Sequence, residues 1–244
     1  MQKNVLTRQS VFIMQKHKQL IFDFDLNQKA GLNHFYFQSE RLASLFDLEN
    51  FSQLPKELLL MGLPGTGKSY LTQAILNDAT SKEIKATYLP LQAILKTGVT
   101  SIEGYEQFEL VIIDGLEHLS FKQDWQTIVF NFLNLAYESN CKVILTAAVN
   151  IPELNFFPDL HSRLMRMEME SLTPLQNDAL RQAIAYVCDS YDITISSKEV
   201  EYLLKRYQRD IGSIMTAIHS LDALSASQKR RITVPLIKEF LDSQ

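Results

Sequence analysis

Short apolar runs alternate with stretches of helical spacing through the middle of the chain. The runs lie at residues 58–61, 86–91, 109–113 and 142–147. They contain few polar residues, and strands without polar alternation are typical of a parallel sheet that helices cover on both faces. We therefore predict an α/β domain over residues 35–171, with a parallel sheet flanked by helices.

The pattern changes after residue 171, where apolar residues recur only at helical spacing. The expected helices cover residues 174–190, 197–207, 210–226 and 234–242, and several begin at Thr, Ser or Asp, which cap helix N-termini. We predict a small all-helical lid domain over residues 172–244. Residues 1–34 lack sustained periodicity and are predicted to form a flexible N-terminal tail.

Residues 62–69 read Gly-Leu-Pro-Gly-Thr-Gly-Lys-Ser and match the phosphate-binding pattern G-x-x-x-x-G-K-[ST] between a predicted strand and a predicted helix. Glycine lets consecutive N–H groups turn toward phosphate oxygens, and the N-terminus of the following helix favours negative charge. Lys68 would neutralise the β- and γ-phosphates, and Ser69 would coordinate Mg²⁺. A glycine-rich surface turn is the alternative, but the flanking elements favour a nucleoside phosphate. The predicted contacts are Gly62, Leu63, Pro64, Gly65, Thr66, Gly67, Lys68, Ser69 and Tyr70.

A second part of the same site is predicted at Asp114, which follows the apolar run of residues 109–113. A carboxylate at the end of a buried strand is the Walker B arrangement, and it would hold Mg²⁺ through water. Many ATPases of this type place a second carboxylate at the next position, where it polarises the attacking water. This chain has Gly115 there, and Glu117 lies two positions further on. We therefore expect weak or no intrinsic ATPase activity.

Residues 158–164, Pro-Asp-Leu-His-Ser-Arg-Leu, follow the last predicted strand and precede the lid domain. In oligomeric ATPases of the AAA+ class, an arginine at this place reaches the γ-phosphate of a neighbouring subunit and raises the hydrolysis rate by ~10³–10⁵. Its planar guanidinium matches phosphate oxygens and stays charged. Arg163 is therefore a candidate arginine finger, although by spacing alone a solvated or salt-bridged arginine is the more frequent situation.

The composition narrows the class of protein. The chain has 244 residues, of which 46% are hydrophobic and 21% charged, and no apolar run approaches the ~20 residues that span a bilayer. Cys141 and Cys188 lie far apart in apolar surroundings and are interpreted as reduced core residues, which favours the cytoplasm. The lack of an apolar run of that length leads us to expect no membrane partner. The net charge is −4 and the pI about 5.8, so we also expect no direct sequence-specific DNA binding.

Taken together, these motifs resemble the Hda family, regulatory inactivators of the replication initiator DnaA that are themselves AAA+ ATPases. The resemblance runs from about residue 19 to residue 241. It is carried by Asp114-Gly115-Leu116-Glu117, by residues 158–164 and by residues 231–239, which read Arg-Ile-Thr-Val-Pro-Leu-Ile-Lys-Glu. The last of these runs is specific to the DnaA and Hda group.

The resemblance implies a regulatory role that is exerted on a partner. Arg163 would enter the nucleotide site of ATP-bound DnaA and stimulate hydrolysis there, which prevents re-initiation of chromosome replication. The chain's own site would hold ADP, the form that the family favours, or ATP. Thr146 falls in the sensor 1 region, and Arg209 is a weak substitute for the sensor 2 arginine because Gly212 occupies the usual position. We expect removal of Arg163 to abolish stimulation and to leave folding and nucleotide binding intact.

Residues 19–24 resemble the peptide Q-L-x-L-x-[LF] by which replication proteins dock on the DNA polymerase III sliding clamp. The glutamine would bind the rim of the clamp's pocket, and the apolar residues would serve as anchors. The predicted clamp contacts are Gln19, Leu20, Ile21, Phe22 and Phe24. A strand packed against the core is the alternative interpretation. Docking on a clamp loaded on DNA would place the protein at the replisome and the nucleoid.

Two other functions stay open. A helicase-loader-type ATPase would cycle on its own ATP in contact with single-stranded DNA; the intact phosphate loop favours it, while Gly115 and the acidic charge count against it. A passive clamp-bound adaptor would use the nucleotide only to stabilise its fold. Assembly with further copies of the chain is also open.

The run Lys229-Arg230-Arg231 is interpreted as a solvated turn, with a weak DNA contact as the alternative.

Overall fold

The computed structural model describes residues 10–15, 18–23, 27, 29–97, 102–148, 150–207 and 210–243, and for residues 10–23 it gives the backbone alone. The chain forms two compact units. The first comprises Met1–Leu32, Ser39–Gly62 and Lys68–Ser171, and the second comprises Asn33–Gln38, Leu63–Gly67 and Leu172–Gln244. We refer to these units as the α/β domain and the lid domain.

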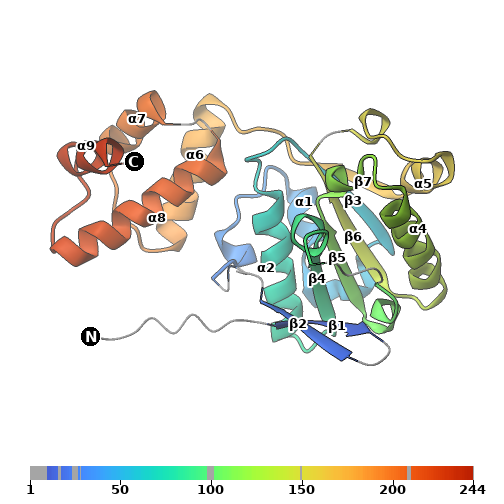
Figure 1. The fold of residues 1–244 in the computed structure, drawn as a ribbon. Coiled ribbons are helices and arrows are strands. Elements are labelled where there is room, and N and C mark those ends of the chain that lie inside the picture. The colour runs from blue at the N-terminus through green and yellow to red at the C-terminus, as the bar shows by residue number, and fades with distance from the viewer. Residues whose placement is uncertain are drawn as a thin grey trace. The chain divides into compact units, whose positions relative to one another are not determined.

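A five-stranded parallel sheet forms the centre of the α/β domain (Figure 1). In the order β4-β5-β6-β3-β7, the strands are Ala86–Pro90, Leu110–Asp114, Lys142–Ala147, Glu57–Met61 and Glu168–Ser171. Leu58, Ile144 and Ile112 lie side by side across three of these strands and are fully buried. The parallel sheet that the apolar runs predicted is therefore confirmed.

Strand β7 is the part of this sheet that the sequence pattern did not predict. It lies at the edge of the sheet, and its four residues are Glu168, Met169, Glu170 and Ser171. Arg41 holds the strand from outside through an ion pair with Glu170, at 2.6 Å between Nη2 and Oε1. An edge strand needs only one apolar face, so β7 contains no apolar run that could reveal it.

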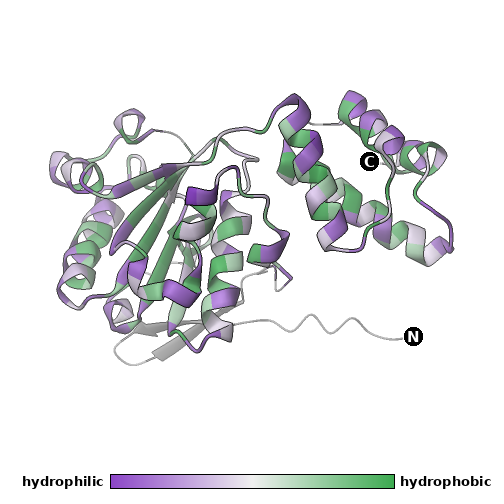
Figure 2. Ribbon diagram, turned by 180° about the vertical axis from the view of Figure 1, so that it is seen from behind, coloured by the Kyte–Doolittle hydropathy of each residue, from purple (hydrophilic) through white to green (hydrophobic). Residues whose placement is uncertain are grey.

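Helices cover both faces of the sheet. Helix α2 (Lys68–Ser81) packs against β4 and β5, and α4 (Gln123–Glu138) packs against β6 and α5 (Pro158–Leu164). Figure 1 shows α2 and α4 on opposite sides of the sheet. The short helices α1 (Glu40–Leu45) and α3 (Leu91–Ile94) complete the domain. The strands and the inward faces of the helices are hydrophobic, as Figure 2 shows, so the core lies between these layers.

In the described part of the lid domain, the chain forms four helices, as predicted. They are α6 (Asn177–Ser190), α7 (Ser197–Arg206), α8 (Ile211–Gln228) and α9 (Val234–Asp242). Their apolar faces share one core, to which Ile184, Leu203 and Ile218 contribute. The segment Asn33–Gln38 belongs to this unit, and its His34 ring stacks on Tyr191 with 3.9 Å between the ring centroids.

The α/β domain begins with an antiparallel hairpin formed by β1 (Ser10–Gln15) and β2 (Lys18–Asp23). The predicted clamp peptide overlaps β2, so its backbone is extended up to residue 23. The side chains of Gln19, Leu20, Ile21 and Phe22, and Phe24 as a whole, lie outside the described part of the chain. Clamp docking, the flexible tail and the domain limits at residues 34 and 171 therefore stay predictions.

Both cysteines are buried free thiols, Cys141 in the α/β domain and Cys188 in the lid. Burial raises the pKa of Cys141 to about 12 and that of Cys188 to about 11. Their interpretation as reduced core residues is confirmed. Across the described residues, the helices are all too short or too polar to cross a membrane.

Candidate functional site

The predicted phosphate loop connects β3 to α2. Gly65 and Gly67 have φ values of 81° and 93°, in the left-handed region where glycine is favoured. The backbone N–H and the hydroxyl of Thr66 both donate to the carbonyl of Leu63, at 3.3 Å and 2.8 Å, which closes a tight turn. Such a turn directs successive N–H groups to one side and forms a concave site for an anion.

Lys68 brings a positive charge to this loop. Its side chain is 8% exposed, and Nζ donates to the carbonyl of Gly62 at 2.5 Å. Burial lowers the pKa of Lys68, and the nearby carboxylates of Glu117 and Asp114 oppose that shift. The lysine therefore lies between the loop and two acidic groups, where a bound phosphate would further favour its charged form.

Three hydroxyl groups converge on the carboxylate of Asp114. Ser69 donates to Oδ2 at 3.0 Å, Tyr88 donates to Oδ2 at 2.5 Å, and Thr146 donates to Oδ1 at 2.5 Å. The structure thus brings together the three residues predicted for this point, Ser69, Asp114 and Thr146. A serine hydroxyl beside a carboxylate is the donor set that phosphate-loop ATPases offer to Mg²⁺, so these residues fit the ion.

Tyr88 is a site residue that the sequence analysis missed. It lies on β4, two residues before the strand ends, and β4 pairs with the strand that carries Asp114. Burial and the neighbouring carboxylate raise the pKa of Tyr88, so its hydroxyl stays protonated and donates. A hydroxyl near the carboxyl end of a strand next to the Walker B strand is the signal that could have revealed it.

The backbone at Gly115 explains why the usual second carboxylate is missing. Gly115 has a φ of 92°, and a Cβ there would lie 2.8 Å from Cδ2 of His118. A glutamate side chain does not fit at this position without strain. The chain instead turns into a 3₁₀ helix, Leu116–Leu119, whose Glu117 accepts a hydrogen bond from the N–H of Ala148 at 3.0 Å. Glu117 is thus held in place near Lys68, a role that sequence spacing left open.

Within the lid domain, the N-terminus of α8 contacts the phosphate loop. The N–H of Gly212 donates to the carbonyl of Gly65 at 3.4 Å, and Asp210 caps the helix by accepting from the N–H of Ser213 at 2.8 Å. A Cβ on Gly65 would lie only 2.5 Å from Oδ1 of Asp210, so glycine is required here. The loop therefore meets a carboxylate at the sensor 2 region. Arg209 lies outside the described residues, and its predicted role stays untested.

Two further predicted loop contacts are Leu63 and Tyr70. Leu63 is 56% exposed. The hydroxyl of Tyr70 accepts a hydrogen bond from the N–H of Gly31 at 3.3 Å, so its side chain anchors the segment before α1. Tyr70 itself lies in the first turn of α2.

The predicted arginine finger lies at the opposite end of β3. Nη1 of Arg163 donates to Oε2 of Glu57 at 2.6 Å, and Nη2 donates to Oε1 of the same carboxylate. The guanidinium also lies over the ring of Tyr137, 5.5 Å from its centroid. The two charged side chains are only 16% and 10% exposed, so Arg163 is salt-bridged in this structure, and its role as an arginine finger stays a prediction. This pair is buried more deeply than the sequence indicated.

A hollow of about 840 Å³ surrounds this ion pair. Helices α4 and α5 supply most of its lining residues, which besides Glu57 and Arg163 are Phe130, Asn134, Tyr137, Glu138, Asp159, Ser162 and Arg166. Arg166 is exposed and makes no ion pair with any residue of the described ranges. The hollow therefore presents one paired and one unpaired guanidinium.

Two families match the chain. Residues 26–169 match the family described as "Bacterial DnaA ATPase domain", and residues 176–241 match the family described as "Hda, lid domain". A similar protein, an uncharacterized protein of Haemophilus influenzae, is 26% identical over 229 residues, which are 93% of this chain and 99% of that protein.

Solved structures of replication initiators have a similar fold. Domain III of DnaA from Thermotoga maritima superposes with a TM-score of 0.72 at 16% identity, over 89% of this chain and 98% of that one. AMPPCP-bound DnaA from Aquifex aeolicus superposes with a TM-score of 0.66 at 24% identity, over 80% of this chain and 66% of that one. At these identities the likeness establishes the fold.

Proposed function

We propose that this chain inactivates DnaA by stimulating hydrolysis of DnaA-bound ATP. The proposal starts from the family: the chain belongs to the bacterial DnaA ATPases, and its helical domain matches the Hda lid domain. Arg163 is the residue that acts on the partner's ATP, in trans. The observation that carries this proposal is the position of Arg163 at the end of β3 opposite to the phosphate loop.

The position of Arg163 separates it from the nucleotide site of its own chain. Arg163 binds Glu57, the first residue of β3, whereas Gly62 follows the last residue of that strand. Five residues of strand span about 16 Å, since each adds roughly 3.3 Å. A guanidinium held there does not reach phosphates in its own loop, but it lies in an open hollow that another molecule can enter.

The ion pair with Glu57 sets the condition under which Arg163 acts. The carboxylate takes both Nη atoms, the same edge of the guanidinium that binds phosphate oxygens in bidentate fashion. A partner must therefore offer a stronger anion than Glu57. The γ-phosphate of ATP on DnaA, with charge that grows toward the transition state, meets this condition.

The chain's own nucleotide has a different role in this proposal. Lys68, Ser69 and Asp114 would hold ADP or ATP with Mg²⁺, and Mg²⁺ would supply charge neutralisation when bound. Gly115 leaves no carboxylate directly after Asp114, so turnover of this nucleotide is weak or absent. The AMPPCP bound to DnaA from Aquifex aeolicus supports nucleotide binding by this chain.

We further propose that residues 19–24 tether the protein to a sliding clamp on DNA. The sequence resemblance supports this step, and an extended backbone suits a peptide that places alternate side chains in a pocket. Tethering raises the concentration of Arg163 near DnaA where replication has just passed. The clamp thereby makes inactivation dependent on replication.

The test measures hydrolysis of ATP bound to DnaA, with and without clamp loaded on DNA. Arg163→Lys keeps a cation beside Glu57 but loses the planar guanidinium. The stimulated rate of ATP hydrolysis on DnaA is expected to fall about 10³-fold with this variant. Arg166→Ala is the matched control in the same hollow and should retain most of it. Stimulation by Arg163→Lys at the wild-type level would overturn the finger role, and loss of stimulation only with the Gln19→Ala or Phe24→Ala variant would leave a passive clamp adaptor.

A further inference from the structure

The outer face of the lid domain carries cations that have no acidic partner. Among the residues that the structure describes, the ion pairs of the lid involve only Arg181 and Arg230. Six other basic side chains are exposed and have no such pair: Lys198, Lys205, Arg206, Lys229, Arg231 and Lys238. We call these six the lid cations.

Helix α7 shows why the lid cations face outward. Its apolar residues Val200, Leu203 and Leu204 are buried in the lid core. At 3.6 residues per turn, the positions opposite to them on the helix are those of Lys198, Tyr202, Lys205 and Arg206. The buried side of α7 thus leaves three exposed cations on its outer side, and the half-buried Tyr202 lies beside them at the edge of the lid core.

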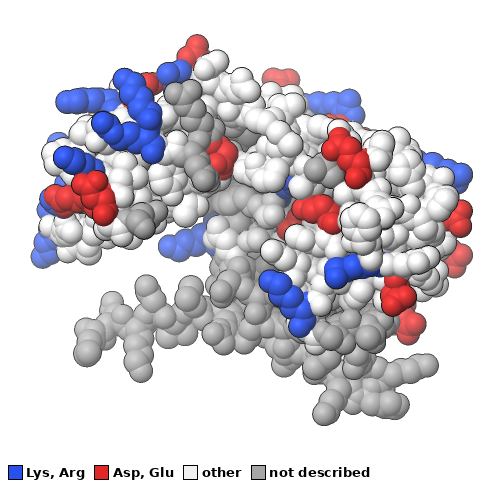
Figure 3. Space-filling model, turned by 45° about the horizontal axis from the view of Figure 1, so that its top comes forward, with Lys and Arg blue, Asp and Glu red and all other residues white. Residues whose placement is uncertain are grey.

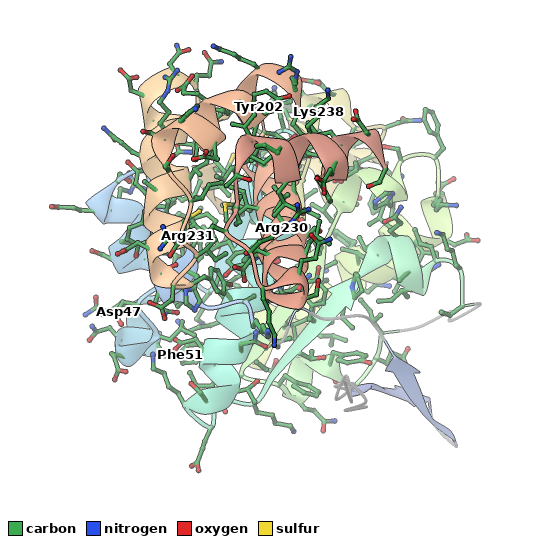
Figure 4. All side chains as sticks on the ribbon, turned by 90° about the vertical axis from the view of Figure 1, so that its left-hand side faces the viewer. Asp47, Phe51, Tyr202, Arg230, Arg231 and Lys238 are labelled. Atoms are coloured by element: carbon green, nitrogen blue, oxygen red, sulfur yellow. The ribbon has the colours of Figure 1, made fainter. Side chains whose placement is uncertain are left out.

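Tyr202 and the last turns of the chain extend this face. The guanidinium of Arg206 lies over the ring of Tyr202, 4.3 Å from its centroid, which fixes the position of that charge. Helix α9, which carries Lys238, packs against α7. Figure 4 shows Tyr202 and Lys238 near the top of the side of the lid that faces the viewer, with Arg230 and Arg231 lower on that side, and Figure 3 shows basic side chains over the lid at the upper left, with some acidic ones beside them.

Two acidic side chains of these helices are paired with cations outside the lid cations. Glu201 binds Arg181 of α6, and Glu239 binds Arg230. Asp222 lies near Cys188, on the side of α8 that packs against α6. The lid domain has as many acidic as basic residues, but among the described residues no ion pair joins an acidic side chain to a lid cation.

We propose that the lid cations bind the sugar–phosphate backbone of double-stranded DNA, independently of its sequence. Several unpaired cations on one face match a polyanion, and such contacts release counterions from DNA. A base could stack on Tyr202 only in competition with Arg206, so the face suits phosphates better than the bases of a single strand. The proposal is independent of the role of Arg163, and it does not involve recognition of the DNA sequence.

The test titrates a fluorescent duplex of mixed sequence with the full chain, without DnaA or clamp, over a series of salt concentrations. The variant Lys205→Glu/Lys238→Glu should bind the duplex at least about tenfold more weakly. The slope of its log affinity against log salt concentration should also become shallower, by the amount expected for the loss of about two phosphate contacts. Lys29→Glu/Lys96→Glu makes the same change of charge on exposed residues of the α/β domain and should bind as the wild type.

Three outcomes would overturn the proposal. The wild type does not bind the duplex, or the two double variants bind equally, or single-stranded DNA binds more tightly than the duplex. Binding to vesicles of anionic lipid that is as strong, and as sensitive to the lid variant, would assign the surface to a membrane instead. Because all substituted side chains are exposed, unchanged thermal unfolding of each variant confirms that only charge has been altered.

Discussion

At the carboxyl end of β3, three hydroxyl groups donate to Asp114, and Lys68 adds a buried cation. At the amino end of the same strand, Arg163 and Glu57 bind each other through two hydrogen bonds. Both regions place charge beside the apolar sheet. In the first, neutral donors hold the carboxylate; in the second, an opposite charge holds the arginine.

This difference determines what each end could bind. The hydroxyls that hold Asp114 are neutral, so they bring no cation that would compete with a metal ion for the carboxylate. An arginine in a buried ion pair has its charge compensated, and another anion must compete for it. Under the proposed function, the carboxyl end of β3 would therefore bind a nucleotide directly, whereas Arg163 would act only when a partner brings a more strongly charged group.

The largest expected effect comes from breaking the ion pair. Replacement of Arg163 by Met leaves the Glu57 carboxylate buried without a cation, and we expect the free energy of unfolding to fall by about 3–5 kcal/mol. Urea unfolding monitored by circular dichroism measures this change. The structure thus revises the expectation that removal of Arg163 leaves folding intact.

The double variant Glu57→Leu/Arg163→Met serves as the control for that experiment. With both charges gone, most of the lost stability should return, since two apolar side chains fill the same space without a desolvation cost. If the single variant costs less than about 1 kcal/mol, the pair is solvated in solution and Arg163 is not held by Glu57.

The carboxyl end of β3 should respond through ligand affinity. Lys68→Ala removes the cation beside the loop and is expected to weaken ADP binding about 10- to 100-fold, because hydrogen bonds to a charged group contribute about 1.5–3 kcal/mol. Isothermal titration calorimetry measures the affinity. Lys82→Ala, just beyond the end of the same helix, removes a cation that pairs with Asp78 and Glu49 and should leave affinity unchanged. Equal affinities for both variants would contradict a phosphate role for the loop.

The hydroxyl network itself can be probed at Thr146, which is 1% exposed and links Asp114 to the N–H of Gly115. Thr146→Val has nearly the same shape but leaves both groups short of a partner, so stability should fall by roughly 1–3 kcal/mol. Thr127→Val, on the exposed side of α4, should change stability by less than about 0.5 kcal/mol. Similar unfolding curves for the two variants would show that water replaces the lost hydroxyl.

The sequence predicts those parts of the fold that depend on local patterns. Four strands and four lid helices follow from runs and periodicity, and Ser69, Asp114 and Thr146 lie together as expected because parallel strands end at one edge. Strand β7 escaped prediction because its residues are mostly polar and it pairs at an edge. Such strands are stabilised by partners that the local sequence does not show.

The site residues that the sequence missed depend on contacts between distant segments. Glu57 is 106 residues from Arg163, and the two pair only because β3 and α5 lie side by side in the folded domain. Tyr88 contacts Asp114 only because β4 and β5 are neighbours in the sheet. The sequence predicts Asp210 only as the N-cap of α8. Its proximity to Gly65 depends on the packing of α8 against the phosphate loop, which the local sequence does not show.

Asp210 offers the smallest but most specific test of the phosphate end. Its carboxylate lies beside Gly65 and would repel the additional charge of a triphosphate more than that of a diphosphate. Asparagine caps helices equally well, so Asp210→Asn should keep α8 intact and raise ATP affinity roughly three- to tenfold, the equivalent of about 1 kcal/mol, with a smaller gain for ADP. Asp222→Asn, exposed on the same helix, is the matched control. Should Asp210→Asn leave the ratio of ATP to ADP affinity unchanged, the carboxylate acts only as a cap, and the loop's preference must arise from Lys68 and Glu117.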